Sequence, residues 1–272
     1  MPLIEFRKIS KQFGRQVVLN HVDLEVREGE SLVIIGASGS GKSVMLKHMV
    51  GLLQPDEGEV WFDGRRIDNL SERELAGIRE QFGFLFQMGA LFDSMNVEDN
   101  VAFPVAQHTD KTKEQISELV DEKLRMVGLP GVRKKMPAEL SGGQRKRVAL
   151  ARAIALSPRV ILYDEPTTGL DPIRSDVINE LIIKLQRELK VTSVVVTHDM
   201  HSAFKIADRI VMLYKGKLIF DGTPQQIRES QDSIVHHFVT GEATEDELAG
   251  LKDSGNDRHA TEAPKVAVKN DE

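Results

Sequence analysis

The stretch SLVIIGASGSGKS, from Ser31 to Ser43, decides the fold of this chain. It joins an apolar run, typical of a strand buried on both faces, to a glycine-rich loop, and a helical pattern begins after Ser43. The last eight residues match G-x-x-x-x-G-K-[ST], a loop whose backbone N–H groups surround phosphate oxygens. A strand before the motif and a helix after it distinguish such a loop from an ordinary glycine-rich turn. The sequence therefore predicts a nucleotide site.

The residues of this loop have different expected roles. Glycines let the backbone wrap around phosphate oxygens without a clash from Cβ. Lys42 can reach the β- and γ-phosphates, and Ser43 can offer its hydroxyl to Mg²⁺. The residues expected to bind the nucleotide here are Gly36, Ala37, Ser38, Gly39, Ser40, Gly41, Lys42 and Ser43.

Polar residues also follow two other apolar runs. RVILYDEP ends in Asp164, expected to orient the Mg²⁺ shell, and Glu165, expected to activate the attacking water as general base. Alternatively, these two carboxylates simply cap the next helix. TSVVVTH ends in His198, and ligands of open α/β sheets bind at the carboxyl ends of the strands. His198 is therefore expected to contact the γ-phosphate, although a histidine there can also be a surface residue.

Strand and helix signals alternate around these motifs. The first sixty residues predict short strands, with Val22, Leu24 and Val26 at the spacing of a half-buried strand. RVILYDEP and TSVVVTHD are each separated from the next strand by a helical stretch, which predicts a parallel sheet covered by helices. DRIVMLYKGKLIFDG predicts a hairpin that turns at Lys215 and Gly216.

Two segments differ from this alternation. From about Ser71 to Leu140 the pattern is helical and begins with a capping box of Ser71 and Glu74, so we expect a helical insertion between strands. From Gly241 onward the chain is acidic and polar, which predicts a mobile tail.

Composition narrows the class of protein. A net charge of -6 disfavours non-specific nucleic-acid binding. No apolar run approaches the roughly 18 residues that span a bilayer, and the N-terminus does not resemble a signal peptide. The chain contains no cysteine, which excludes disulfides and thiolate metal sites and fits a reducing compartment. We therefore expect a cytoplasmic protein.

A second anion-binding pattern occurs in ELSGGQRKR. Gly142 and Gly143 lie where a loop enters a helix, so free N–H groups and a positive dipole end face an anion. Capping of that helix by Ser141 is also physically sound, but it does not explain two glycines where a good helix former would serve better.

Four motifs, GASGSGKS, LSGGQ, VILYDEP and VVTHD, follow one another in the order found in ABC-type ATPases, which the chain resembles from Leu3 to about Val239. The resemblance implies an α/β P-loop fold with a mixed or parallel core sheet, an N-terminal antiparallel β subdomain and an inserted helical subdomain. It implies ATP and Mg²⁺ as cofactors. The expected domain covers residues 1–240 with the insertion at about 88–145, and the acidic tail covers 241–272.

The resemblance implies roles for further residues. Phe13 corresponds to the aromatic residue that stacks on adenine, and Gln87 to the residue that touches Mg²⁺ and the attacking water. Asp171 resembles the aspartate that crosses between subunits. In a head-to-tail homodimer, ATP on the P-loop of one copy is covered by residues of the other: Ser141, Gly142, Gly143 and Gln144. The expected catalytic residues are Lys42, Gln87, Glu165 and His198, and the expected metal ligands are Ser43, Gln87 and Asp164.

The spacing of these motifs favours the ATPase subunit of a membrane transporter. Only about fifty residues separate Gln87 from Ser141, whereas coiled-coil repair ATPases insert hundreds, and translation ATPases carry two cassettes. A transporter ATPase needs multi-span membrane partners. An apolar loop around Gly89 (Met88, Ala90, Leu91 and Phe92) either forms a groove for a helix of such a partner or packs in the core. The expected core residues next to it are Val97, Val101 and Phe103.

Within the ABC ATPases, FQMGALFDSMNVEDNVAFP and DEPTTGLDPI resemble the Mla/Mce group, which moves phospholipid or other lipids across the bacterial envelope. This implies a homodimer on the cytoplasmic face of the inner membrane, under two permease subunits and an MCE-domain lipid carrier. A small STAS-domain regulator is common in the group, and nucleic acid is not an expected partner. The alternatives are an importer ATPase for a polar solute, such as an amino acid, and a soluble ABC ATPase. The tail either clasps a neighbouring subunit or is solvated.

Overall fold

The computed structural model describes residues 1–242. The chain divides into two compact units, Met1–Glu229 and Ser230–Glu272. The first unit therefore ends before the boundary at residue 240 that the sequence suggested. In the second unit the described residues form α9 (Ser233–Thr240), capped by the Asp232 side chain. Apart from its first two residues, the predicted tail (241–272) lies outside the described residues.

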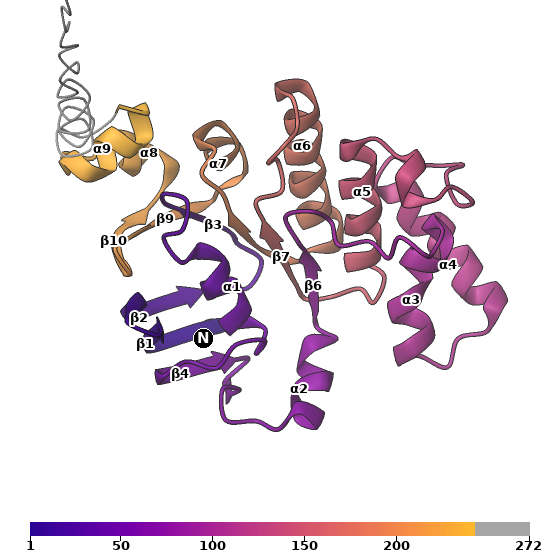
Figure 1. Ribbon diagram of the computed structural model, residues 1–272, viewed down its shortest axis with the longest axis horizontal. Coiled ribbons are helices and arrows are strands. Elements are labelled where there is room, and N and C mark those ends of the chain that lie inside the picture. Colours follow the sequence, from indigo (N-terminus) through magenta and orange to yellow (C-terminus); the bar gives the residue numbers. More distant parts are fainter. Residues whose placement is uncertain (243–272) are drawn as a thin grey trace, which may run out of the picture. The chain divides into compact units, whose positions relative to one another are not determined.

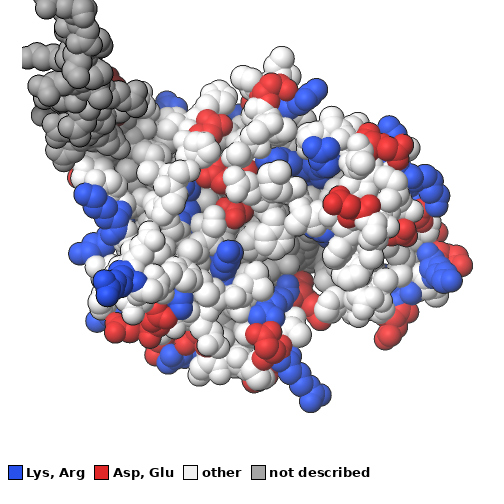
Figure 2. Space-filling view, in the orientation of Figure 1, with Lys and Arg blue, Asp and Glu red and all other residues white. Residues whose placement is uncertain are grey.

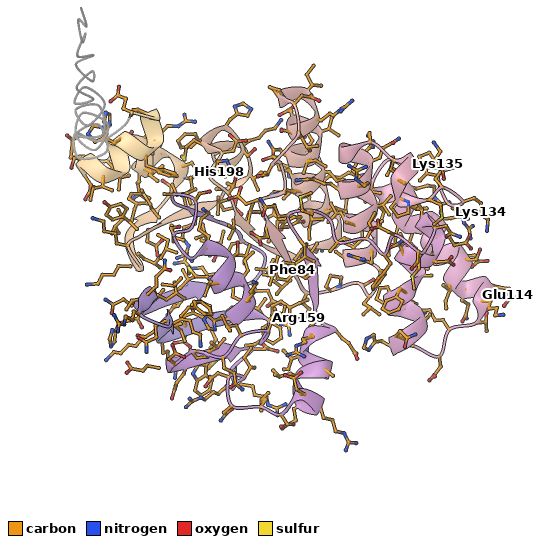
Figure 3. The ribbon with its side chains drawn as sticks, in the orientation of Figure 1. Phe84, Glu114, Lys134, Lys135, Arg159 and His198 are labelled. Atoms are coloured by element: carbon orange, nitrogen blue, oxygen red, sulfur yellow. The ribbon has the colours of Figure 1, made fainter. Side chains whose placement is uncertain are left out.

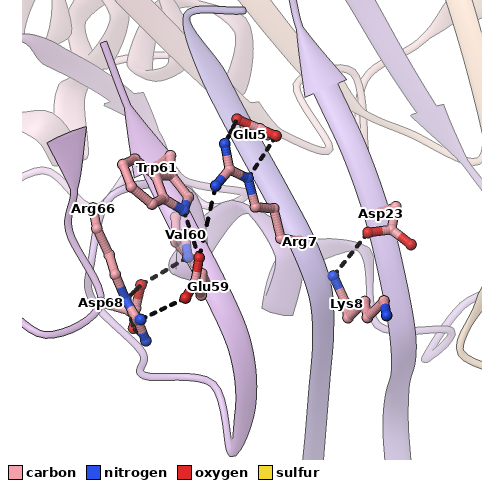
Figure 4. A network of polar contacts seen from close by, with 9 residues as sticks. All are labelled: Glu5, Arg7, Lys8, Asp23, Glu59, Val60, Trp61, Arg66 and Asp68. Atoms are coloured by element: carbon pink, nitrogen blue, oxygen red, sulfur yellow. Dashed lines mark hydrogen bonds and ion pairs between the residues drawn. The ribbon is translucent and has the colours of Figure 1, made fainter. Parts of the chain in front are cut away.

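The N-terminal sheet is antiparallel, as expected. Its order is β2-β1-β4-β5, formed by β1 (Ile4–Phe13), β2 (Gln16–Val26), β4 (Glu57–Phe62) and β5 (Arg65–Arg66). One face is apolar and buried, and the other carries a polar network in which the Arg7 guanidinium lies 4.4 Å from the centre of the Trp61 ring (Figure 4). This two-residue alternation of apolar and polar side chains gives one face to the core and one to solvent.

The central sheet holds the strands that end in the sequence motifs. Its order is β10-β9-β3-β8-β7-β6, formed by β3 (Ser31–Ile35), β6 (Phe82–Leu85), β7 (Val160–Asp164), β8 (Thr192–Val196), β9 (Arg209–Tyr214) and β10 (Lys217–Gly222). All neighbouring strands are parallel except β9 and β10, which form the predicted hairpin. The fold class expected from the sequence, a mixed α/β sheet with an N-terminal antiparallel subdomain, is confirmed.

Helices flank both sheets in the first unit (Figure 1). They are α1 (Lys42–Met49), α2 (Glu72–Arg79), α3 (Val97–His108), α4 (Lys113–Met126), the 3₁₀ helix η1 (Pro137–Glu139), α5 (Gly142–Ala153), α6 (Pro172–Leu189), α7 (Met200–Ile206) and α8 (Pro224–Arg228). The predicted capping box of Ser71 and Glu74 starts α2. In Figure 1, α3 and α4 lie side by side next to α5. Within residues 1–242, no helix has both the length and the apolar character needed to cross a bilayer.

One core joins the two sheets through α1. Met45, Leu46 and Met49 of this helix are fully buried among apolar side chains of β1, β3, β4, β7 and β8. Because interiors are close-packed, the start of α1 is fixed relative to the ends of β3 and β7. This packing positions the loop that the sequence marks as the phosphate site.

Two expectations about the middle of the chain are wrong. Strand β6 was missed: it interrupts the supposed helical segment from Ser71 to Leu140 and pairs with β7. Its four residues, FGFL, are too short to show a period. Phe103 is not a core residue, because it is 37% exposed, whereas Val97 and Val101 are fully buried as expected.

Candidate functional site

The glycine-rich loop runs from the end of β3 to the start of α1, and two of its glycines are required by space. A Cβ on Gly36 (φ 151°) would lie 2.4 Å from the carbonyl oxygen of Leu213. A Cβ on Gly41 (φ 108°) would lie 2.8 Å from a methyl group of Val18. Any other residue would push the loop away from β9 or β2.

Lys42 is the first residue of α1, and its ammonium points back into the loop. Its Nζ donates hydrogen bonds to the carbonyls of Gly36 (2.8 Å) and Ala37 (3.1 Å) and lies 3.7 Å from Oε1 of Glu165. Burial lowers the pKa of Lys42, and the Glu165 carboxylate opposes that shift. A buried cation inside a glycine-rich loop is suited to a polyphosphate.

Ser43 and Asp164 bring two oxygen donors together at the carboxyl ends of β3 and β7. The Ser43 hydroxyl donates a hydrogen bond of 2.7 Å to Oδ1 of Asp164. Burial raises the pKa of Asp164, and the hydrogen bond from Ser43 acts in the opposite direction. Within residues 1–242 no three His, Cys, Asp or Glu side chains form a metal cluster. Mg²⁺ in nucleotide sites needs only one or two protein oxygens, with phosphates and water completing its shell, so this pair fits the ion.

Glu165 is 8% exposed and is held from several sides. Its Oε2 lies 2.9 Å from Nδ1 of His198 and accepts a hydrogen bond of 3.2 Å from the Thr168 hydroxyl. Its backbone N–H donates to the carbonyl of Val196 on the neighbouring strand β8, at 2.9 Å. The alternative, that Asp164 and Glu165 only cap the next helix, does not hold, since Asp171 caps α6.

A cavity of about 330 Å³ brings most of the predicted residues together. Its predicted lining residues are Phe13, Ser38, Gly39, Gly41, Lys42, Ser43, Gln87, Glu165 and His198. Figure 3 labels His198, which immediately precedes the Asp199 cap of α7. Val18 and Val44 complete the wall and were not predicted. Four other predicted residues do not line the cavity but lie within two positions of lining residues in the sequence: Gly36, Ala37, Ser40 and Asp164. Phe13, 49% exposed at the end of β1, is available for stacking on a base.

The LSGGQ residues, called the signature from here on, lie elsewhere in the described chain, as does Asp171. Ser141 caps α5 in a capping box with Gln144, and Gly142 and Gly143 form the first turn of that helix. Asp171 caps α6 by accepting a hydrogen bond of 2.9 Å from the N–H of Arg174. None of these residues lines the cavity around Lys42. A single chain thus presents the two expected anion-binding elements separately.

A second cavity, of about 340 Å³, is an apolar groove whose walls include Phe84, Phe86, Phe92, Phe103 and Arg152. The rings of Phe84 and Phe86 stack with centroids 4.1 Å apart, and those of Phe92 and Phe103 lie 4.9 Å apart. Figure 3 labels Phe84, which comes from β6 at the edge of the central sheet.

The sequence located this groove only in part. Phe92 and Ala90 line it, but Met88 and Leu91 are not among its lining residues, and Met88 is 86% exposed. Phe103, assigned to the core, lines the groove instead.

Two cations of α5 that bind backbone carbonyls were also missed. Arg152 donates hydrogen bonds to the carbonyls of Gly89 (3.0 Å) and Ala90 (2.8 Å), just after Gln87. Lys146 is 7% exposed and donates to three carbonyls of the segment after Asp164. The sequence did contain a signal for the burial of Lys146. This residue lies four positions before Leu150, and residues four apart share one face of a helix, here the apolar face.

The site and fold together define the class of this protein. Residues 19–168 match the family model described as ABC transporter. The chain belongs to the ABC transporter family, as an ATP-hydrolysing subunit.

Several relatives are similar in sequence over most of this chain. The chain is 45% identical over 241 residues to the intermembrane phospholipid transport system ATP-binding protein MlaF of Haemophilus influenzae, covering 89% of this chain and 91% of that one. It is 43% identical over 238 residues to a probable ribonucleotide transport ATP-binding protein, mkl, of Mycobacterium leprae, covering 88% of this chain and 69% of that one. The dimeric ATP-binding cassette MJ0796, solved in a post-hydrolysis state with ADP and Pi, superposes with a TM-score of 0.76 at 35% identity, covering 81% and 98% of the two chains.

Proposed function

We propose that this chain powers phospholipid or other lipid transport across the bacterial envelope by hydrolysing ATP. The identity with a protein named for intermembrane phospholipid transport extends over 91% of that protein, whereas the relative named for ribonucleotide transport is covered over only 69%. The GALF sequence after Gln87 supports the same group. Transport of a polar solute is the second candidate, and the name of the mycobacterial relative favours it.

The observation that carries the ATPase proposal is the contact of Glu165 with both Lys42 and His198 in one cavity. Glu165 acts as general base toward the attacking water, and His198 orients its carboxylate. Lys42 and the loop N–H groups bind the β- and γ-phosphates and stabilise charge on the transferring phosphoryl group. Gln87 contacts the γ-phosphate side of the same cavity.

The proposed sites for the metal and for adenine lie in or beside the same cavity. Ser43 and Asp164 would hold Mg²⁺, with Gln87 as a further ligand. The bound ion would offset the negative charge of the phosphates. Phe13 stacks on the adenine, and Val18 excludes water beside it.

A homodimer completes the site. Ser141, Gly142, Gly143 and Gln144 close over ATP bound to the partner copy, and Asp171 lies in the contact between copies. The separation of the signature from the cavity in one chain supports this arrangement, as does the dimeric state of MJ0796. Closure excludes water from the phosphates, which strengthens every electrostatic interaction there.

The apolar groove receives a helix from each of two multi-span permease subunits. Its five phenylalanines and the aliphatic stem of Arg152 offer an apolar surface that suits the apolar face of a helix. Arg152 lines the groove and is hydrogen-bonded to the segment after Gln87. A displacement of the groove residues would therefore shift Gln87 in the cavity around Lys42. The complex lies on the cytoplasmic face of the inner membrane, with an MCE-domain lipid carrier and, in some systems, a STAS-domain regulator. Basic and acidic side chains are interspersed on the face in Figure 2, consistent with no nucleic-acid partner.

The test is affinity purification of the full chain from native membranes in mild detergent, with mass spectrometry of co-purifying proteins and lipids. We expect a multi-span permease, an MCE-domain protein and phospholipid. A permease accompanied by a solute-binding protein without lipid would instead support the polar-solute candidate. Recovery of no membrane protein would contradict a transport function.

A further inference from the structure

Lys146 uses all of its hydrogen-bond donors on one short backbone segment. It lies in α5, five residues after Ser141, and its ammonium is buried. Nζ donates to the carbonyl of Glu165 at 3.2 Å, of Pro166 at 2.7 Å and of Thr168 at 2.8 Å. An ammonium has three N–H donors, so its capacity is fully used. Burial lowers the pKa of Lys146 to about 8, which leaves most of it charged at neutral pH.

This segment is the one that holds the general base in an unusual conformation. Glu165 has φ +49°, in the left-handed region that non-glycine residues rarely adopt. Its carbonyl also accepts a hydrogen bond of 3.3 Å from the N–H of Thr168, which closes the turn. Three carbonyl dipoles converge on one point, and such convergence is unfavourable without a cation between them. The ammonium of Lys146 is that cation.

We propose that Lys146 is a positioning residue for Glu165. Its ammonium fixes the turn from Glu165 to Thr168, so that the carboxylate remains between His198 and Lys42. Because Lys146 belongs to the helix that Ser141 starts, it also ties the signature element of a chain to the general base of the same chain. This inference rests on the proposed ATPase function, in which Glu165 is the base.

Arg147 provides a matched control in the same helix. Its guanidinium also donates to backbone carbonyls, at 3.0 Å from Gly128 and 3.4 Å from Val127, but these belong to the end of α4. Replacing either cation by methionine removes a charged anchor of α5 and keeps an apolar stem. Only the substitution at Lys146 releases the Glu165 segment.

The experiment measures ATP hydrolysis by the full chain assembled with its membrane subunits, for wild type, K146M, R147M, E165Q and the double variant K146M/E165Q. We expect K146M to lower kcat by about tenfold to 100-fold, the size of effect that misplacing a catalytic group produces, with KM for ATP unchanged. R147M should retain most of the wild-type kcat. In single-turnover measurements the double variant should be no slower than E165Q, because Lys146 acts through Glu165.

The outcomes distinguish failure of the positioning role of Lys146 from failure of the general-base role of Glu165. Equal kcat values for K146M and R147M would overturn the positioning role, and so would multiplied losses in the double variant. Full hydrolysis by E165Q would instead overturn the proposed general base. Thermal unfolding and ATP binding establish that the variants fold. Should K146M not fold, K146Q, which keeps an amide donor, replaces it with the same expected direction.

Discussion

Nδ1 of His198 lies 2.9 Å from Oε2 of Glu165, although the two residues follow different strands. The contact exists because β7 and β8 are parallel neighbours, so their carboxyl ends meet at one edge of the sheet. The imidazole is about half exposed, whereas the carboxylate is nearly buried. His198 therefore covers the solvent side of Glu165 and fixes the direction in which its carboxylate points.

Substitution of His198 by alanine should lower kcat by about 100-fold and leave ATP affinity nearly unchanged, because the orientation of the base is lost while the phosphate loop remains intact. Steady-state ATPase measurements and ATP titration test this. His201→Ala, three residues further on the exposed side of α7, is the control and should behave like wild type. Equal losses of kcat from both substitutions would contradict the role of His198 in orienting Glu165.

Substitution of Lys42 by alanine should weaken ATP binding at least tenfold, since it removes the cation nearest to the bound phosphates. Isothermal titration with ATP measures the change, and thermal unfolding checks the fold. Lys47, exposed in the same helix, provides the control Lys47→Ala. Unchanged affinity in Lys42→Ala would show that the phosphates bind elsewhere.

Ser141→Arg should stop hydrolysis in the complex while an isolated chain still binds ATP, because in the proposed homodimer the signature residue acts on ATP of the partner copy. The substitution also removes a helix cap, which costs about 1 kcal/mol. Thr112→Arg removes the matching cap of α4, where Thr112 and Gln115 form the same capping box, and controls for that loss. Loss of ATP binding to the isolated chain would contradict donation between copies.

Phe92→Asp should release the membrane subunits, since a carboxylate in the apolar groove disrupts packing against an inserted helix. Met88→Asp is the control, because Met88 is exposed and does not line the groove. Co-purification followed by mass spectrometry measures both. Release by Met88→Asp but not by Phe92→Asp would place the permease on the loop rather than in the groove.

The sequence predicted the strand ends well because each depends on a local pattern. VILYD before Glu165 and TSVVV before His198 are apolar runs that end in polar residues, and a parallel sheet brings such ends together. The cavity around Lys42 thus follows from short motifs, each confined to a few consecutive residues.

The sequence failed where the location depends on distant partners. Strand β6 has only four residues and becomes recognisable through its pairing with β7. Phe103 has helical spacing from buried residues, yet it faces the groove, because its ring packs on Phe92 rather than in the core. In the sequence Lys146 is one of three consecutive basic residues, and only the folded chain shows the three carbonyls around its ammonium.

Stability should fall as pH decreases because of a buried histidine in α1. His48 is 1% exposed, and its Nδ1 lies 2.7 Å from the carbonyl of Leu53. Its Nε2 is among the buried atoms of the described chain that have no hydrogen-bond partner. Burial lowers the pKa of His48 from 6.5 to about 4.

Between these two pKa values the unfolded chain binds a proton that the folded chain does not. The stability due to neutral His48 is thus fully present above pH 6.5 and is lost as pH falls toward 4. We expect a loss of about 2 kcal/mol between pH 7 and pH 5. Urea unfolding at both pH values measures it, with His48→Met as the variant that cannot titrate and exposed His201→Gln as the control. If His48→Met loses as much stability as wild type over this range, another group is responsible.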